Sequence, residues 1–194
     1  MGELMARIFA ILGFLAVLGA CSGAADLDQP PVALGDFKLG HNVAVASKAK
    51  KGPFSRNATE DELVAAIKKA VEERFGRYDG EGLYHFGISV EGYVIAAPGV
   101  PLVLSPKSIM IVNFTVWDNA AGVKLNEEVH QITVLESFGS GALIGSGFTM
   151  TKDEQLEQLS QNAIKAVETY LVKQHKELGW FKPQIQNDGN EPLT

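Results

Sequence analysis

Apolar residues recur along this chain with the two-residue period of β-strands. Residues 84–90 alternate between apolar and polar side chains, whereas residues 41–46 form a short, valine-rich run. Because successive side chains of a strand point to opposite faces, such patterns predict half-buried or buried strands. The expected strands are residues 41–46, 84–96 and 108–117 and, after a turn at 118–122, a fourth strand over 123–125 and 127–136.

Two other segments have the three- and four-residue spacing of an amphipathic helix. Each begins with a Thr that is followed three residues later by Glu, at Thr59 and Glu62 and again at Thr151 and Glu154. In this capping box the Thr hydroxyl accepts from the backbone of the Glu, whose carboxylate reaches back to the Thr backbone. A glycine ends each apolar pattern, at Gly76 and Gly179, which predicts the helix boundaries.

The order is therefore strand, helix, three strands, helix. A helix that joins the first two strands makes them parallel if they pair, and the later strands can form an antiparallel meander. Both helices have one apolar face, which must pack on the sheet. We expect an α+β two-layer sandwich, with a four-stranded mixed sheet and two helices on one face.

The N-terminus is more apolar than any other part of the chain. The uncharged run from Ile8 to Ala20 has 13 residues. About 20 are needed to span a membrane, whereas about 7 to 15 suffice for a signal peptide. It leads into Leu18-Gly19-Ala20-Cys21, which resembles a bacterial lipobox. The resemblance implies cleavage of residues 1–20 and attachment of diacylglycerol to the Cys21 sulfur, with acylation of the new N-terminus.

The alternative is that the first 20 residues remain as a helix and Cys21 is an ordinary thiol. The residue after the cysteine is Ser22 and not Asp, which favours the periplasmic face of the outer membrane over the inner membrane. Residues 21–40 contain Pro30 and Pro31 and show no regular period, so they predict a lipidated N-terminus with a flexible tether. The single domain is then expected over residues 41–181, with a disordered tail over 182–194.

The composition of the chain excludes several classes of function. The 194 residues carry a net charge of −6, which argues against nucleic acid as the main partner. One cysteine excludes an internal disulfide and a cysteine-based zinc site. The four histidines are far apart in the sequence, and those on expected strands, His85 and His130, are interpreted as outward polar residues and not metal ligands. No nucleophile with a base and an orienting group stands out, so we expect no enzyme activity, cofactor or metal.

The lipobox, the proline-containing tether, the order of elements and the hairpin at residues 116–122 together resemble a diffuse group of small proteobacterial lipoproteins. Some of these resemble auxiliary lipoproteins of ABC-type lipid transporters, and others the globular part of the curli-secretion lipoprotein. The resemblance implies a non-catalytic periplasmic module.

Two connecting segments are candidate contact surfaces. Residues 138–148 are rich in glycine but lack the Lys and Ser or Thr of a phosphate-binding loop. They are either a packed connection or an apolar tip formed around Leu143 and Ile144. Residues 97–107 hold three prolines and an apolar run that includes Leu102 and Leu104. They form either a packed loop or a lip for a partner.

The expected function is that of a membrane-anchored periplasmic lipoprotein, acting as a binding or assembly module with a protein partner in the envelope. The alternative is an auxiliary subunit of a lipid-transport or secretion machine that contacts lipid or exported substrate.

Overall fold

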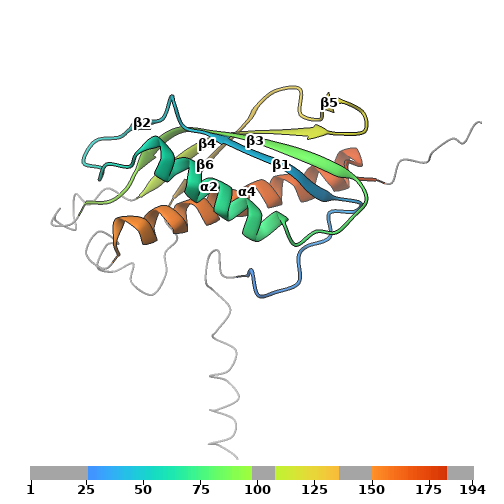
Figure 1. Ribbon diagram of the computed structural model, residues 1–194, viewed down its shortest axis with the longest axis horizontal. Helices are drawn as coiled ribbons and strands as arrows, with labels where there is room; N and C mark the ends of the chain where they lie inside the picture. The colour runs from blue at the N-terminus through green and yellow to red at the C-terminus, as the bar shows by residue number, and fades with distance from the viewer. Residues whose placement is uncertain (1–25, 98–107, 136–149, 183–194) are drawn as a thin grey trace, which may run out of the picture.

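The computed structural model describes residues 26–97, 108–135 and 150–182 (Figure 1). Each helix begins at its capping box, in which the Thr hydroxyl accepts from the Glu backbone and the Glu carboxylate accepts from the Thr backbone. The elements are β1 (Lys38–Val45), β2 (Lys50–Lys51), α2 (Glu60–Phe75), β3 (Leu83–Val94), β4 (Ile109–Asp118), β5 (Val123–Lys124), β6 (His130–Leu135) and α4 (Lys152–Leu178).

The strands form one mixed sheet with both helices on the same face (Figure 1). β1 is parallel to β3 across the α2 connection, and β3, β4 and β6 are antiparallel neighbours. The expected α+β class is therefore confirmed, but within the described residues the sheet has six strands and not four. The two additional strands are only two residues long: β2 pairs with β3, and β5 pairs with β4.

The expected fourth strand is divided into β5 and β6 because Asn126 turns its side chain into the sheet. Its Oδ1 accepts from the Val116 N–H at 3.0 Å, and its Nδ2 donates to the Phe114 carbonyl at 2.9 Å. Asn126 is buried, so its amide takes the place of a backbone partner for β4. The chain between β5 and β6 leaves the ladder at this point without exposing unpaired groups of β4.

The packed chain also begins earlier than residue 41, which corrects the expected tether and domain start. Leu34 and Phe37 are each only 1% exposed, and β1 begins at Lys38. The Phe37 ring stacks on Tyr84 at 5.5 Å between centroids and meets the edge of Phe181 at 5.1 Å. Residues near both ends of the described chain therefore complete one aromatic cluster, so residues 26–40 belong with the domain.

Asn126→Ala should lower the free energy of unfolding by about 1–3 kcal/mol, because it leaves a buried N–H and a buried carbonyl of β4 without partners. Gln131→Ala removes an exposed amide of β6 and should change stability by about 0.5 kcal/mol or less. Urea unfolding of both variants measures the difference. Equal losses would mean that Asn126 does not bridge the break between β5 and β6.

Candidate functional site: the anchor cluster

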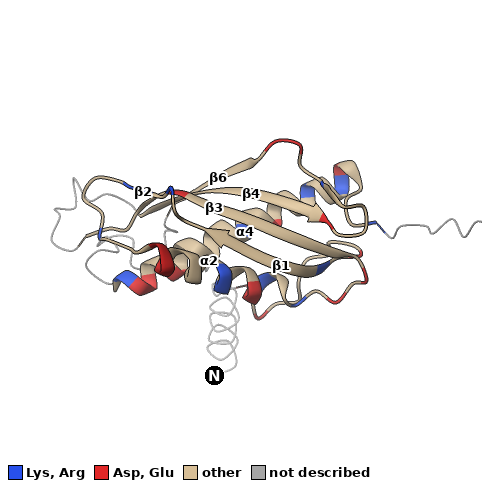
Figure 2. Ribbon diagram, turned by 45° about the horizontal axis from the view of Figure 1, so that its top comes forward, with Lys and Arg blue, Asp and Glu red and all other residues tan. Residues whose placement is uncertain are grey.

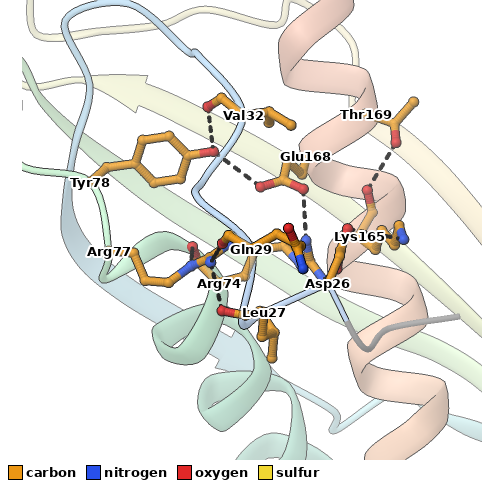
Figure 3. A network of polar contacts seen from close by, with 10 residues as sticks. All are labelled: Asp26, Leu27, Gln29, Val32, Arg74, Arg77, Tyr78, Lys165, Glu168 and Thr169. Atoms are coloured by element: carbon orange, nitrogen blue, oxygen red, sulfur yellow. Dashed lines mark hydrogen bonds and ion pairs between the residues drawn. The ribbon is translucent and has the colours of Figure 1, made fainter. Parts of the chain in front are cut away.

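A buried ion pair joins the two helices. Arg74 of α2 and Glu168 of α4 have side chains only 3% and 7% exposed, and Arg74 Nη1 donates to Glu168 Oε2 at 2.7 Å. The Tyr78 hydroxyl lies 3.0 Å from the other carboxylate oxygen of Glu168 (Figure 3). Charges this deeply buried are tolerated only when they are paired and hydrogen-bonded, so the pair fixes α2 against α4.

The N-terminal segment of the described chain is attached to this pair. Asp26 Oδ1 accepts from Arg74 Nη2 at 2.8 Å, and Asp26 Oδ2 lies 3.0 Å from Lys165 Nζ. Arg77 Nη1 donates to the carbonyls of Leu27 and Gln29, both at 2.8 Å.

Tyr78 completes the attachment, because its hydroxyl also donates to the Val32 carbonyl at 2.9 Å (Figure 3). The polar contacts thus join the segment from residue 26 to residue 32 to side chains from both helices and from Tyr78. We call the side chains that make them the anchor cluster: Asp26, Arg74, Arg77, Tyr78, Lys165 and Glu168.

The protonation states of Asp26 and Tyr78 agree with the hydrogen bonds that these residues make in the anchor cluster. Partial burial disfavours the Asp26 carboxylate, but the hydrogen bonds and positive charges of Arg74 and Lys165 outweigh this and lower its pKa to about 2. Burial, together with the charge of Glu168, raises the pKa of Tyr78, so its hydroxyl stays protonated and can donate. At neutral pH the cluster therefore holds Asp26 as an ion and Tyr78 as a donor.

Sequence reasoning did not identify the anchor cluster. Arg74 and Glu168 sit next to apolar residues of their helix stripes, Arg74 between Val71 and Phe75 and Glu168 beside Val167. A charged residue within the apolar stripe of a helix indicates that it has a buried partner. This pattern in the sequence could have pointed to the anchor cluster.

Arg74→Met should destabilise the protein by about 3–5 kcal/mol, because it leaves the buried Glu168 carboxylate without its cation. Lys69→Met, which removes an exposed ion pair between the same two helices, should change the stability far less than Arg74→Met does. The double variant Arg74→Met/Glu168→Met should regain much of the loss, since no buried charge remains. Chemical denaturation tests all three variants. A small loss in the first would contradict the assignment of a paired buried ion.

The site residues expected from sequence lie outside the described residues. This applies to Cys21 and to the candidate contact residues Leu102, Leu104, Leu143 and Ile144. The strand ends that flank the two candidate loops are described, and they are neighbours: Val94 pairs with Ile109, which pairs with Leu135. Within the described ranges, no helix is long and apolar enough to span a bilayer.

The face of the sheet opposite the helices is uncharged over most of its area. Figure 2 shows the charged residues mainly on the helices, the connections and the strand ends. Val43, Val45, Trp117 and Leu135 are about half exposed on this face. We call it the open face, and its residues by strand alternation are His41, Val43, Val45, His85, Gly87, Ser89, Ile109, Ile111, Asn113, Thr115, Trp117, Gln131, Thr133 and Leu135, with Glu91 as a charged residue at the bulge of β3.

The two strand histidines differ from each other. His85 lies on the open face as expected, where it stacks on His41 and its Nδ1 accepts from the His41 backbone N–H at 2.8 Å. His130 instead points toward α4 and stacks on Tyr170, with ring centroids 3.8 Å apart. The expectation of an outward position was therefore wrong for His130. In the described part of the chain, no group of three or more His, Cys, Asp or Glu side chains could hold a metal.

The packing of His130 predicts a loss of stability in acid. Burial, with a smaller effect of Lys173, lowers its pKa below the ordinary value near 6.5, so between the two values the unfolded chain binds more protons. The contribution of neutral His130 is complete above about pH 6.5 and is lost as the pH falls through the lower folded value. His130→Phe keeps a ring on Tyr170 and should reduce the fall in unfolding free energy between pH 7.5 and pH 5. Identical pH profiles for both proteins would disprove this.

Comparisons with known proteins find a loose similarity to lipoproteins of proteobacteria. No protein family and no curated protein matches the sequence. A predicted lipoprotein from Caulobacter crescentus is similar in structure, with 13% identity, a TM-score of 0.39 and coverage of 72% of this chain and 90% of that one.

Two further solved structures show the same level of similarity. A protein of family DUF330 from Xanthomonas campestris has 13% identity and a TM-score of 0.38, covering 77% of this chain and 94% of its own. The PelC dodecamer from Paraburkholderia phytofirmans has 12% identity and a TM-score of 0.32, with coverages of 73% and 94%. At these values the similarity does not indicate what this chain binds.

Proposed function

We propose that this chain is a lipoprotein of the bacterial envelope that acts as a non-catalytic binding or assembly module, attached to the membrane through acyl chains on Cys21. The observation that carries the proposal is the position of Asp26, which the anchor cluster holds against both helices. Cys21 precedes Asp26 by only five residues. The tether is therefore much shorter than the one expected over residues 21–40.

This short tether gives the module an orientation. Five residues reach at most about 18 Å, even when fully extended. The described chain begins on the helix side of the molecule (Figure 1). Acyl chains on Cys21 would therefore keep the helix layer near the lipid headgroups and turn the open face away from them. Two or more acyl chains are needed for firm anchoring, and lipidated cysteines of this type carry them.

The open face is the surface that we assign to a protein partner in the envelope. The chain has a net charge of −6, whereas residues in the middle of the open face, such as Gly87, Asn113 and Thr115, carry no formal charge that a partner would have to desolvate. Ser22 after the cysteine favours the periplasmic face of the outer membrane as the location.

Cys21→Ser tests the anchor. It should reduce incorporation of labelled palmitate to background and move the protein from the detergent phase to the aqueous phase. The melting temperature shows whether the described domain, which begins at Asp26, is still folded in the variant. Ser22→Ala keeps the cysteine and is the matched control, which should remain labelled and membrane-bound. If the Cys21→Ser protein stays in the detergent phase, an uncleaved N-terminal helix is the anchor and the proposal fails.

A further inference from the structure

Phe54 is the most exposed large apolar side chain of the described residues, at 75% exposure. It lies in the connection between β2 and α2, and its backbone has a φ of +56°. A bulky side chain adopts this left-handed conformation only at a cost in backbone strain. Neither the exposure nor the strain stabilises the folded domain, so the role of Phe54 lies outside the packing of the core.

The backbone on both sides of Phe54 is bound to the end of β3. The Gly52 N–H donates to the Tyr93 carbonyl, and the Arg56 N–H donates to the Ile95 carbonyl, both at 2.8 Å. The connection is therefore pinned before and after Phe54, and its side chain projects from a fixed loop at one end of the sheet (Figure 1).

The chain around Phe54 is basic. Residues 37–59 contain no Asp or Glu, although the whole chain has 23 of them. Lys48, Lys50 and Lys51 are exposed, and they form no ion pair with the other described residues. We call Lys48, Lys50, Lys51 and Phe54 the basic tip.

Acidic side chains adjoin the basic tip on two elements. Glu60 and Asp61 lie in the first turn of α2, and Glu91 lies at the bulge of β3. These acids reduce the positive charge of this end of the molecule at a distance. Because the Debye length at physiological salt is about 8 Å, the lysines attract an anionic surface only when they lie close to it. An apolar side chain that enters the surface keeps them there.

A lipid surface fits the basic tip better than a protein does. A specific protein interface buries about 800 Å² on each partner, but Phe54 is the only large apolar side chain exposed over residues 46–59. The headgroup layer of a bilayer accepts a single phenylalanine. Each lysine near an anionic bilayer strengthens binding about fivefold.

We infer that the basic tip is a membrane contact, in which Phe54 enters the headgroup layer of an anionic bilayer and the three lysines lie against its phosphates. This contact does not depend on acyl chains at Cys21. One consequence does depend on them: the basic tip precedes α2, whereas Arg74, which binds Asp26, lies in its last turn. The basic tip and the proposed anchor together would lay α2 along the bilayer.

Tryptophan fluorescence of the full-length protein on phospholipid vesicles tests the inference. Phe54→Trp places a probe at the basic tip, and Val123→Trp places the same probe at an exposed site at the other end of the sheet. The vesicles are phosphatidylcholine alone or an equimolar mixture with phosphatidylglycerol, and part of the lipid is brominated to quench tryptophans that it touches. The emission of Trp117 and Trp180 is measured in the unsubstituted protein and subtracted.

The tryptophan at position 54 should be quenched several-fold more on the anionic vesicles than on the neutral ones, whereas the one at position 123 should not respond to lipid charge. Replacing the three lysines of the basic tip with Gln should abolish the difference. The matched control removes the same charge from three exposed lysines elsewhere and should keep the difference. It is the triple variant Lys68→Gln/Lys173→Gln/Lys176→Gln.

Equal quenching at positions 54 and 123 on anionic vesicles would overturn the inference, and so would equal effects of the two triple variants. Absence of lipid quenching at position 54 would also overturn it and would favour an acidic protein as the partner of the basic tip. Sedimentation with neutral vesicles reports the anchor separately. Protein that does not sediment with them but is quenched at position 54 on anionic vesicles contradicts only the anchor at Cys21.

Discussion

The buried pair of Arg74 and Glu168 is the contact on which the arrangement of the helix layer depends. Neither charge can remain in the interior alone, so α2 and α4 must meet at the position where both groups are satisfied. Hydrophobic stripes define which faces of two helices touch, but they tolerate small shifts along the axis. The ion pair removes that freedom, and Asp26 and Tyr78 then use its remaining hydrogen-bonding capacity. The start of the packed chain is therefore fixed by the same contact that fixes the helices.

The regular elements could be predicted because their signals are local. A capping box needs only four consecutive residues, and Thr59 with Glu62 forms the expected bonds. The short strand Lys50–Lys51 could not be predicted, since a strand of two residues exists only through its partner, whereas Val123–Lys124 lies within the expected strand over 123–125. The packing of Phe37 was missed for a related reason. It lies in a segment with proline and glycine neighbours, and its contacts with Tyr84 and Phe181 join residues far apart in sequence.

In the candidate site too, local features could be predicted from the sequence, whereas contacts between distant segments could not. A charged residue at a buried helix position is visible in the sequence, so Arg74 and Glu168 could each have been recognised as needing a partner. That Asp26 would be one of the partners could not have been recognised, because it depends on how a segment without regular structure crosses two helices. The lipid attachment at Cys21 and the contact role of Leu102, Leu104, Leu143 and Ile144 stay predictions, since those residues lie outside the described ranges.

The two faces of the molecule differ in a way that matters for a tethered module. The helix side carries the start of the described chain, while the open face carries uncharged residues on the opposite side (Figures 1 and 2). A domain on a long tether rotates freely and loses that freedom when it binds a partner, which weakens binding. A domain whose tether is fixed within five residues of its anchor has given up much of this freedom beforehand. With the proposed anchor at Cys21, short tethering would therefore strengthen binding at the proposed partner surface on the open face without requiring any additional contact there.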